Sequence, residues 1–201
     1  MAYIQELVFV GWVKPTINYW KDTMSYYRRE FNEGGTYFFT VVLQNRKLGL
    51  LCQFIELFRA SVHKTLQEHP FEIIAIVVLP DHFHLLMKLP DDDDNFPIRI
   101  RKIKSYFSQS LPQEYKFPTE SQKRKGESGV WQRRYWEHCI RDDKDLSNHI
   151  DYIYYNPVKH GYVNNVKDWQ WSSFHRDVRL GIFDIEWGSQ VDKFVALNEF
   201  E

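Results

Sequence analysis

The sequence contains almost no cysteine. Cys52 and Cys139 are the only two among 201 residues, too few for a disulfide framework or for a zinc site built from four cysteines. A reducing, cytosolic environment is therefore expected. Long hydrophobic runs are also missing, because the longest beyond the first residues, 73–79, is far shorter than the ~20 apolar residues that cross a bilayer. The short apolar run near the start lacks a basic segment and a cleavage site, so we expect neither secretion nor a membrane partner.

The chain has little net charge. Its 26 basic and 27 acidic residues give a formal charge of −1, which excludes a uniformly basic nucleic-acid-binding protein but not a local basic patch. Such a patch is present, since residues 99–134 hold ten basic and three acidic side chains, a local charge of +7. A nucleic-acid backbone attracts such a concentration of positive charge, although lysine-rich loops are often only solvated.

Aromatic residues are abundant, at 17% of the chain, and most are expected to pack in the core. Within the basic segment, however, rings and charges occur together, which favours binding of unpaired bases over simple solvation. The side chains that we expect to contact DNA are Arg99, Arg101, Lys102, Lys104, Lys123, Arg124, Lys125, Arg133 and Arg134, with Trp131 as a ring for stacking.

The order of secondary-structure signals predicts an α+β fold. Strand-like runs occupy residues 36–44, 71–79 and 82–89, and helical periodicity marks residues 53–68 and 97–110. A third helix is expected to begin at Asp142 or Asp143 and to end at Pro157. The simplest arrangement is a ferredoxin-like antiparallel sheet with helices on one face. We expect an N-terminal extension over residues 1–33, one domain over 34–180 and a C-terminal tail over 181–201.

Two histidines flank a phenylalanine at the start of a predicted strand. Because side chains alternate along a strand, His82 and His84 lie on one face and Phe83 on the other. Imidazole nitrogens bind Mn, Zn, Fe or Ni and complete oxygen-rich Mg sites. Two histidines that merely share a face are a common alternative, and the bare pattern does not decide between the two interpretations. The apolar residues around the pair favour coordination, since polar groups in such a setting need a partner.

The third predicted helix carries a polar face. Asp145, His149, Tyr152 and Asn156 recur along it at helical spacing. Tyr152 and Asn156 are four residues apart and are therefore neighbours on this face. A phenol with a pKa of ~10 is a poor nucleophile unless a metal or cations polarise the group that it attacks. The Asn156 carbonyl is placed to join His82 and His84 on one ion. The alternative is that Tyr152 packs in the core and Asn156 only precedes the helix end.

Four segments together resemble the REP-associated tyrosine transposases, relatives of the IS200/IS605 single-strand transposases in the HUH endonuclease superfamily. They are residues 34–40 (GGTYFFT), 78–86 (VLPDHFHLL), 131–138 (WQRRYWEH) and 152–161 (YIYYNPVKHG). The resemblance covers residues from about 25 to about 190, and the extension before it departs from the family pattern.

The resemblance implies a Y1 transposase domain that uses Mg²⁺ or Mn²⁺ to cleave and rejoin single-stranded or hairpin DNA of the repetitive extragenic palindromic (REP) type. His82 and His84 match the family's metal-binding pair, Tyr152 its nucleophile and Asn156 its third metal ligand. Tyrosine attack leaves a 5′-phosphotyrosine and a free 3′-hydroxyl. A bacterial, nucleoid-associated location follows, and the family includes both monomers and homodimers.

Two other functions remain compatible with these residues. One is a non-catalytic regulatory protein that binds hairpin DNA through the same fold and basic surface. The other is a metal-dependent hydrolase that uses His82, His84 and a bound water, with Tyr152 in a structural role.

Overall fold

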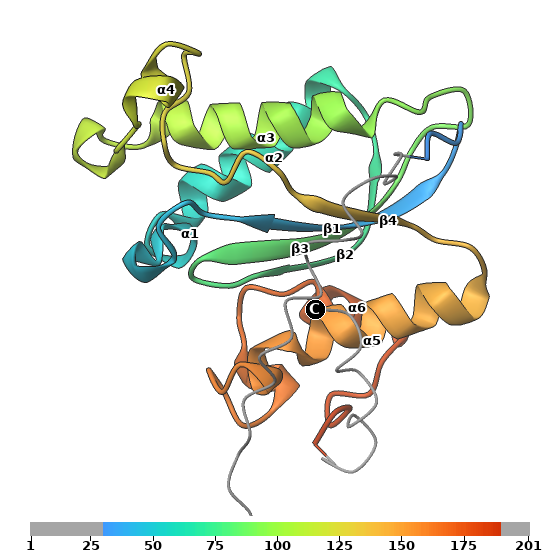
Figure 1. Ribbon diagram of the computed structural model, residues 1–201. Coiled ribbons are helices and arrows are strands. Elements are labelled where there is room, and N and C mark those ends of the chain that lie inside the picture. The colour runs from blue at the N-terminus through green and yellow to red at the C-terminus, as the bar shows by residue number, and fades with distance from the viewer. Residues whose placement is uncertain (1–29, 190–201) are drawn as a thin grey trace, which may run out of the picture. The chain divides into compact units, whose positions relative to one another are not determined.

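A four-stranded antiparallel sheet forms the centre of the computed structural model, which describes residues 30–189 (Figure 1). The strands are β1 (Thr36–Val42), β2 (Glu72–Val78), β3 (His82–Lys88) and β4 (Trp136–Cys139). Their order across the sheet is β2-β3-β1-β4. The predicted α+β class is confirmed. Residues 1–29 of the predicted extension and residues 190–201 of the predicted tail lie outside the described residues.

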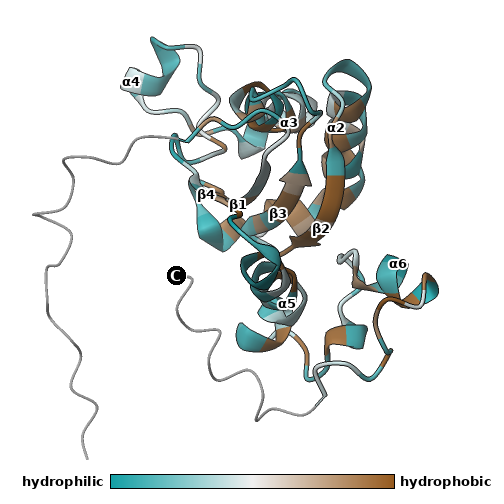
Figure 2. Ribbon diagram, turned by 90° about the vertical axis from the view of Figure 1, so that its right-hand side faces the viewer, coloured by the Kyte–Doolittle hydropathy of each residue, from teal (hydrophilic) through white to brown (hydrophobic). Residues whose placement is uncertain are grey.

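Helices cover both faces of the sheet. Helices α2 (Ile55–Glu68) and α3 (Phe96–Ser110) pack on one face, and α5 (Asp143–Lys159) and α6 (Phe174–Arg179) lie on the other (Figures 1 and 2). The expectation of helices on one face therefore holds for α2 and α3, while the third predicted helix lies opposite. Side chains along β1 point alternately to the two faces of the sheet, which explains the two layers. Phe39 belongs to the core between the sheet and helices α2 and α3, and Phe38 belongs to the core between the sheet and α5.

Short helical turns occupy the connections. They are η1 (Arg46–Leu48), α1 (Leu50–Gln53), η2 (Gln113–Tyr115), α4 (Glu120–Lys123) and η3 (Val166–Asp168). Helix α4 begins with a capping box, in which the Thr119 side chain accepts from the Gln122 backbone and the Gln122 side chain accepts from the Thr119 backbone. The basic segment between α3 and β4 is therefore an ordered loop that contains two short turns.

The turn at Pro80 and Asp81 joins β2 to β3, as predicted. The Leu79 N–H donates to the His82 carbonyl at 2.9 Å and closes the hairpin. The Leu43 N–H donates to the Asp81 carbonyl at 2.8 Å and ties the turn to the end of β1. His82 is thus fixed as the first residue of β3.

Helix α5 begins where the sequence predicts and ends later. The Asp142 side chain accepts the Asp145 N–H at 2.8 Å as N-cap, but the predicted end at Pro157 is wrong because the helix continues to Lys159. Proline lies in the last turn, where it removes one hydrogen bond, and its ring is buried. The His160 N–H donates to the Asn156 carbonyl at 3.0 Å, so regular geometry extends through the residues that follow Asn156.

The two edges of the sheet differ. The segment after η3 covers the outer edge of β2, with Trp171 accepting from the Val78 N–H and the Ser173 N–H donating to Ile76, each at 2.9 Å. At the other edge lies β4, where no strand is predicted. It pairs with β1 in a register that sets Thr40 opposite Trp136.

Candidate active site between β3 and α5

The two histidines of β3 face α5. The ring of His84 lies 5.1 Å from that of Tyr152, and the ring of His82 lies 5.3 Å from that of His160, measured between centroids. The histidine rings themselves are 4.9 Å apart. The structure therefore brings together three side chains that the sequence singled out, and it adds His160.

Asn156 lies on the same face of α5, one helical turn from Tyr152 and one from His160. Its side chain is fully buried, and neither Oδ1 nor Nδ2 has a hydrogen-bond partner among the described residues. The Nε2 atom of His84 is likewise buried without a partner there. Leaving such atoms unsatisfied costs about 1–3 kcal/mol each, so their gathering at one place needs an explanation such as a ligand.

Tyr152 lies at the centre of this arrangement and is 1% exposed. Its ring and that of Phe38 form a T-shaped pair with centroids 5.8 Å apart. The Lys159 ammonium lies 5.0 Å from the centre of the Tyr152 ring. This contact is a cation–π interaction that places a positive charge beside the Tyr152 ring.

A chain of three side chains orients His82. Its Nδ1 donates to Asp81 at 2.8 Å, and the Arg46 guanidinium donates to the other Asp81 oxygen. Burial by itself raises the pKa of the Asp81 carboxyl, but these two hydrogen bonds outweigh it and hold the pKa below its usual value. With its proton on Nδ1, a neutral His82 keeps the Nε2 lone pair available for a metal ion, as in histidines that bind metals. The sequence signals Asp81 only by its position next to His82, and gives no signal for Arg46.

His84 is also oriented from its Nδ1 side, by a hydrogen bond of 3.0 Å with the Thr40 hydroxyl. Complete burial lowers the pKa of His84 well below the ordinary value, and nearby positive groups lower it further. The imidazole is therefore neutral near pH 7, the state in which it binds a metal.

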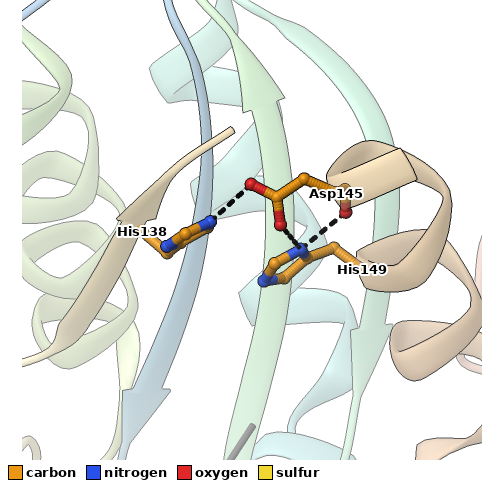
Figure 3. A group of neighbouring side chains, drawn as sticks. All are labelled: His138, Asp145 and His149. Atoms are coloured by element: carbon orange, nitrogen blue, oxygen red, sulfur yellow. Dashed lines mark hydrogen bonds and ion pairs between the residues drawn. The ribbon is translucent and has the colours of Figure 1, made fainter. Parts of the chain in front are cut away.

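A second cluster joins β4 to α5. It consists of His138, Asp145 and His149, whose ligand atoms all lie within 4.8 Å of one another, so that they could hold a metal ion (Figure 3). Asp145 bonds His138 Nε2 at 2.7 Å through one oxygen and approaches His149 Nδ1 at 3.1 Å through the other. Sequence patterning places Asp145 and His149 on the polar face of α5, but His138 comes from the strand that was not predicted.

Hydrogen bonds define the protonation of this second cluster. His149 Nδ1 lies 2.8 Å from the Asp145 backbone carbonyl, which only accepts, so Nδ1 carries the proton. Burial lowers the pKa of His149. Burial by itself raises the pKa of Asp145, but the hydrogen bonds from His138 and the Arg141 N–H outweigh it, and the pKa is lowered. The cluster is a carboxylate that clamps two imidazoles.

Two of the predicted DNA-contacting residues lie in the interior. Arg99 is 1% exposed and donates to Asp93 and to the Pro70 carbonyl, and the Trp131 indole is buried, donating to the Lys104 carbonyl at 3.0 Å. Neither offers its charge or ring to solvent, so both are withdrawn from the expected DNA surface. A side chain in an amphipathic helix and a ring beside a basic loop cannot be placed inside or outside by composition alone.

The other basic residues lie on α3 and the loop that follows. Lys102, Lys123 and Arg133 form ion pairs with Glu68, Glu120 and Glu127. Among residues 30–189, no acidic partner is found for Arg101, Lys104, Arg124, Lys125 and Arg134.

A cavity of about 600 Å³ lies between α3 and this loop. Arg101, Lys104, Lys116 and Arg133 line it, and burial lowers the pKa of Lys104 to about 8. The cavity is on the layer of α3, so the structure does not bring it together with the histidines and Tyr152 under α5.

None of the helices within residues 30–189 is long and apolar enough to cross a membrane.

Comparison with known proteins gives one consistent result. The family model described as "Transposase IS200 like" matches residues 33–156. A Haemophilus influenzae protein described as a REP-associated tyrosine transposase is 56% identical over 169 residues, covering 84% of this chain and 96% of its own. The REP-associated tyrosine transposase of Escherichia coli K12 is 45% identical over 173 residues, covering 86% and 96%. A solved structure of a REP-associated tyrosine transposase bound to a REP hairpin superposes with a TM-score of 0.71 at 45% identity, covering 84% and 93%.

Proposed function

Because the chain belongs to the REP-associated tyrosine transposases, within the IS200-like transposase family, we propose that it cleaves and rejoins REP-type hairpin DNA with Tyr152 as nucleophile. The observation that carries the proposal is the contact of the His84 ring with the Tyr152 ring, beside the unsatisfied amide of Asn156. The substrate is a single strand that folds into a hairpin, and the place of action is the bacterial nucleoid in the cytoplasm.

The residues under α5 fit a divalent metal ion. Two imidazoles and a carboxamide oxygen are suitable ligands, and the partnerless His84 Nε2 and Asn156 Oδ1 atoms are the buried donors that such an ion would satisfy. His82, His84 and Asn156 would hold Mg²⁺ or Mn²⁺, which when bound supplies charge stabilisation at a phosphate oxygen. The His138, Asp145 and His149 cluster fits less well, since the Asp145 carboxylate already contacts His138 Nε2 and His149 Nδ1.

The chemistry exchanges one phosphodiester bond for another. The Tyr152 oxygen attacks phosphorus, its proton is released, and the bond from phosphorus to the 3′-oxygen breaks. That oxygen takes up a proton to become a free 3′-hydroxyl, and the strand remains on Tyr152 as a 5′-phosphotyrosine. Lys159, beside the Tyr152 ring, stabilises the phenolate during the attack. A 3′-hydroxyl reverses the step, so no nucleotide cofactor is needed.

The cations on α3 and on the loop that follows it are proposed to hold the DNA backbone. They comprise the half-buried Lys102 and Lys104 and the exposed Arg101, Lys123, Arg124, Lys125, Arg133 and Arg134. Contacts from such residues are largely independent of sequence, and they position the strand rather than read its bases.

The test is the covalent adduct. Wild-type protein, incubated with Mg²⁺ or Mn²⁺ and single-stranded REP-type hairpin oligonucleotides, is expected to form a protein–DNA band that resists denaturation. Tyr152→Phe should lose this band and keep its affinity for the hairpin. Tyr155→Phe, on the same helix, is the matched control and should retain the band. An adduct formed by Tyr152→Phe would overturn the assignment.

A second function is favoured by the burial of Tyr152, which is 1% exposed. A nucleophile must be reached by its substrate, and a buried one suits a non-catalytic protein that keeps the fold to bind hairpin DNA. Binding without any adduct over a range of metal concentrations would support this alternative. Cleavage without an adduct, retained in Tyr152→Phe, would instead indicate a hydrolase.

A further inference from the structure

Trp136 presents a large ring at the edge of the sheet, close to the candidate active site. Its side chain is 44% exposed, whereas most rings in residues 30–189 are buried. Thr40 is paired with His84 on one side and with Trp136 on the other, so the three residues form one row across β3, β1 and β4. At about 4.8 Å per strand, Trp136 lies about 10 Å from His84 along that row.

The buried side of the Trp136 ring is fixed by a column of parallel rings. The Trp136 ring and the His138 ring are 5.9 Å apart with only 4° between their planes. His138 in turn stacks on His149 at 4.8 Å and 15°. Asp145 bonds both imidazoles, as Figure 3 shows, so neither ring of the clamp turns freely.

Phe38 completes the support of the indole. Its ring lies 5.5 Å from that of Trp136 in a T-shaped arrangement and also contacts the rings of His149 and Tyr152, at 4.8 and 5.8 Å between centroids. A ring held from two sides loses little conformational freedom when a ligand covers its open side. The position of Trp136 is therefore tied by contacts to that of the nucleophile.

A positively charged residue lies close to Trp136 in the sequence. Arg134 is two residues before Trp136, is exposed, and has no ion-pair partner among residues 30–189. An exposed aromatic ring two residues from an unpaired arginine is a combination that suits single-stranded nucleic acid, since the ring can stack a base and the cation can meet a phosphate.

We propose that Trp136 is a stacking site for one unpaired base of the strand that is cut, with His138 and Asp145 as positioning residues. The proposal rests on the proposed function for the identity of the strand. Stacked DNA rises ~3.4 Å per nucleotide in each strand, so a site ~10 Å from His84 takes a base within about three nucleotides of the scissile phosphate. Because every base has a π face, this site holds the strand in place without selecting its sequence.

The test uses fluorescence of the DNA. The probe is a REP-type hairpin with single-stranded flanks, carrying one 2-aminopurine at each flanking position in turn, since stacking quenches this base. Wild-type protein should quench one or two adjacent positions, and Trp136→Phe should keep most of that effect. Trp136→Leu should abolish it and weaken binding about five-fold to about 100-fold. Phe117→Leu, at a ring 60% exposed on the α3 side, is the control and should match wild type.

The positioning role has its own readout. His138→Ala should reduce the quenching at the same position, and His138→Phe should restore it, because phenyl replaces the stacked ring without its hydrogen bond to Asp145. Thermal unfolding of each variant shows that the chain is folded. Restored stability without restored quenching in His138→Phe would assign His138 a structural role only.

The outcomes separate this inference from the proposed function. If wild type forms the covalent adduct and Trp136→Leu forms it with unchanged hairpin affinity and unchanged quenching, the stacking site is wrong and the nuclease assignment stands. If Trp136→Leu loses the quenching while wild type forms no adduct, the stacking site stands and the catalytic proposal fails.

Discussion

The imidazole of His84 meets the phenol ring of Tyr152 nearly edge to face, with centroids 5.1 Å apart and an angle of 72° between the planes. The two residues come from β3 and α5, which are far apart in the chain and packed face to face in the fold. This contact joins the predicted metal ligands to the predicted nucleophile, and it makes the residues around it the most informative to change.

Removing the amide of Asn156 should separate stability from metal binding. Asn156→Ala deletes two buried atoms without partners among the described residues, so the metal-free variant should be as stable as wild type or more stable by up to about 1 kcal/mol. The rise in melting temperature that Mn²⁺ gives the wild type should be lost. Calorimetry with and without Mn²⁺ measures both. Asn165→Ala, at an exposed amide, is the control, and an unchanged Mn²⁺ effect in Asn156→Ala would exclude this residue as a ligand.

Arg99 should matter for folding and not for DNA. Arg99→Met removes a buried guanidinium that satisfies Asp93 and the Pro70 carbonyl, and we expect a loss of about 3 kcal/mol in the free energy of unfolding. Arg101→Met, on the same helix but exposed, should change stability by less than about 0.5 kcal/mol and should weaken DNA binding. Urea unfolding and a binding titration on both variants check this. Equal effects of the two changes on DNA affinity would contradict the placement of Arg99.

Lys104 should make stability depend on pH in the alkaline range. Burial lowers its folded pKa to about 8, while an unfolded lysine keeps a value of ~10.4. Between these values the unfolded state binds more protons, so wild-type stability should gain a contribution as pH rises from about 8 to about 10. Lys104→Met lacks this group and should be more stable than wild type at pH 7, with the difference shrinking toward pH 10. Urea midpoints at four pH values measure the trend, and a constant difference would contradict it.

The loop cations should control the salt dependence of binding. Replacement of Lys123, Arg124 and Lys125 by alanine should weaken hairpin binding and lower the slope of log K against log salt by about one unit for each phosphate that the variant no longer neutralises. Titrations between about 50 and 200 mM salt give the slope. Arg59→Ala, which removes a cation paired with Glu56 on α2, should leave it unchanged. An unaltered slope in the triple variant would assign the loop to simple solvation.

Most of the fold was predictable because its long elements carry strong local signals. The β2 to β3 hairpin follows from two apolar runs around Pro80, and the start of α5 follows from the capping of Asp142. Strand β4 could not be predicted, because its four residues show no alternation of apolar and polar side chains. It forms through its pairing with β1, which is not visible in the local sequence. Pro157 likewise lies inside α5 because its ring is buried, and this burial outweighs the usual tendency of proline to end a helix.

The candidate site was predictable only in part, for the same reason. Spacing along one element places His82 beside His84 and Tyr152 beside Asn156, because periodicity is local. The orienting partners come from other elements, such as Arg46 before α1 and Thr40 on β1. The His138 clamp was missed because it requires β4. Whether Arg99 faces the interior depends on the loop that supplies Asp93.

The two edges of the sheet differ in how many of their backbone groups are already hydrogen-bonded. Trp171 and Ser173 take up backbone groups of β2, and Arg176 donates to the Ile73 carbonyl at 2.9 Å, so a visiting strand finds few vacant backbone groups there. Within residues 30–189, β4 pairs with β1 alone. Among residues 30–189, the edge of the sheet that no other strand pairs with is that of β4, so a strand that continues the sheet would add there, next to Trp136. Self-association by strand addition and access of a DNA strand to that tryptophan would compete for one edge.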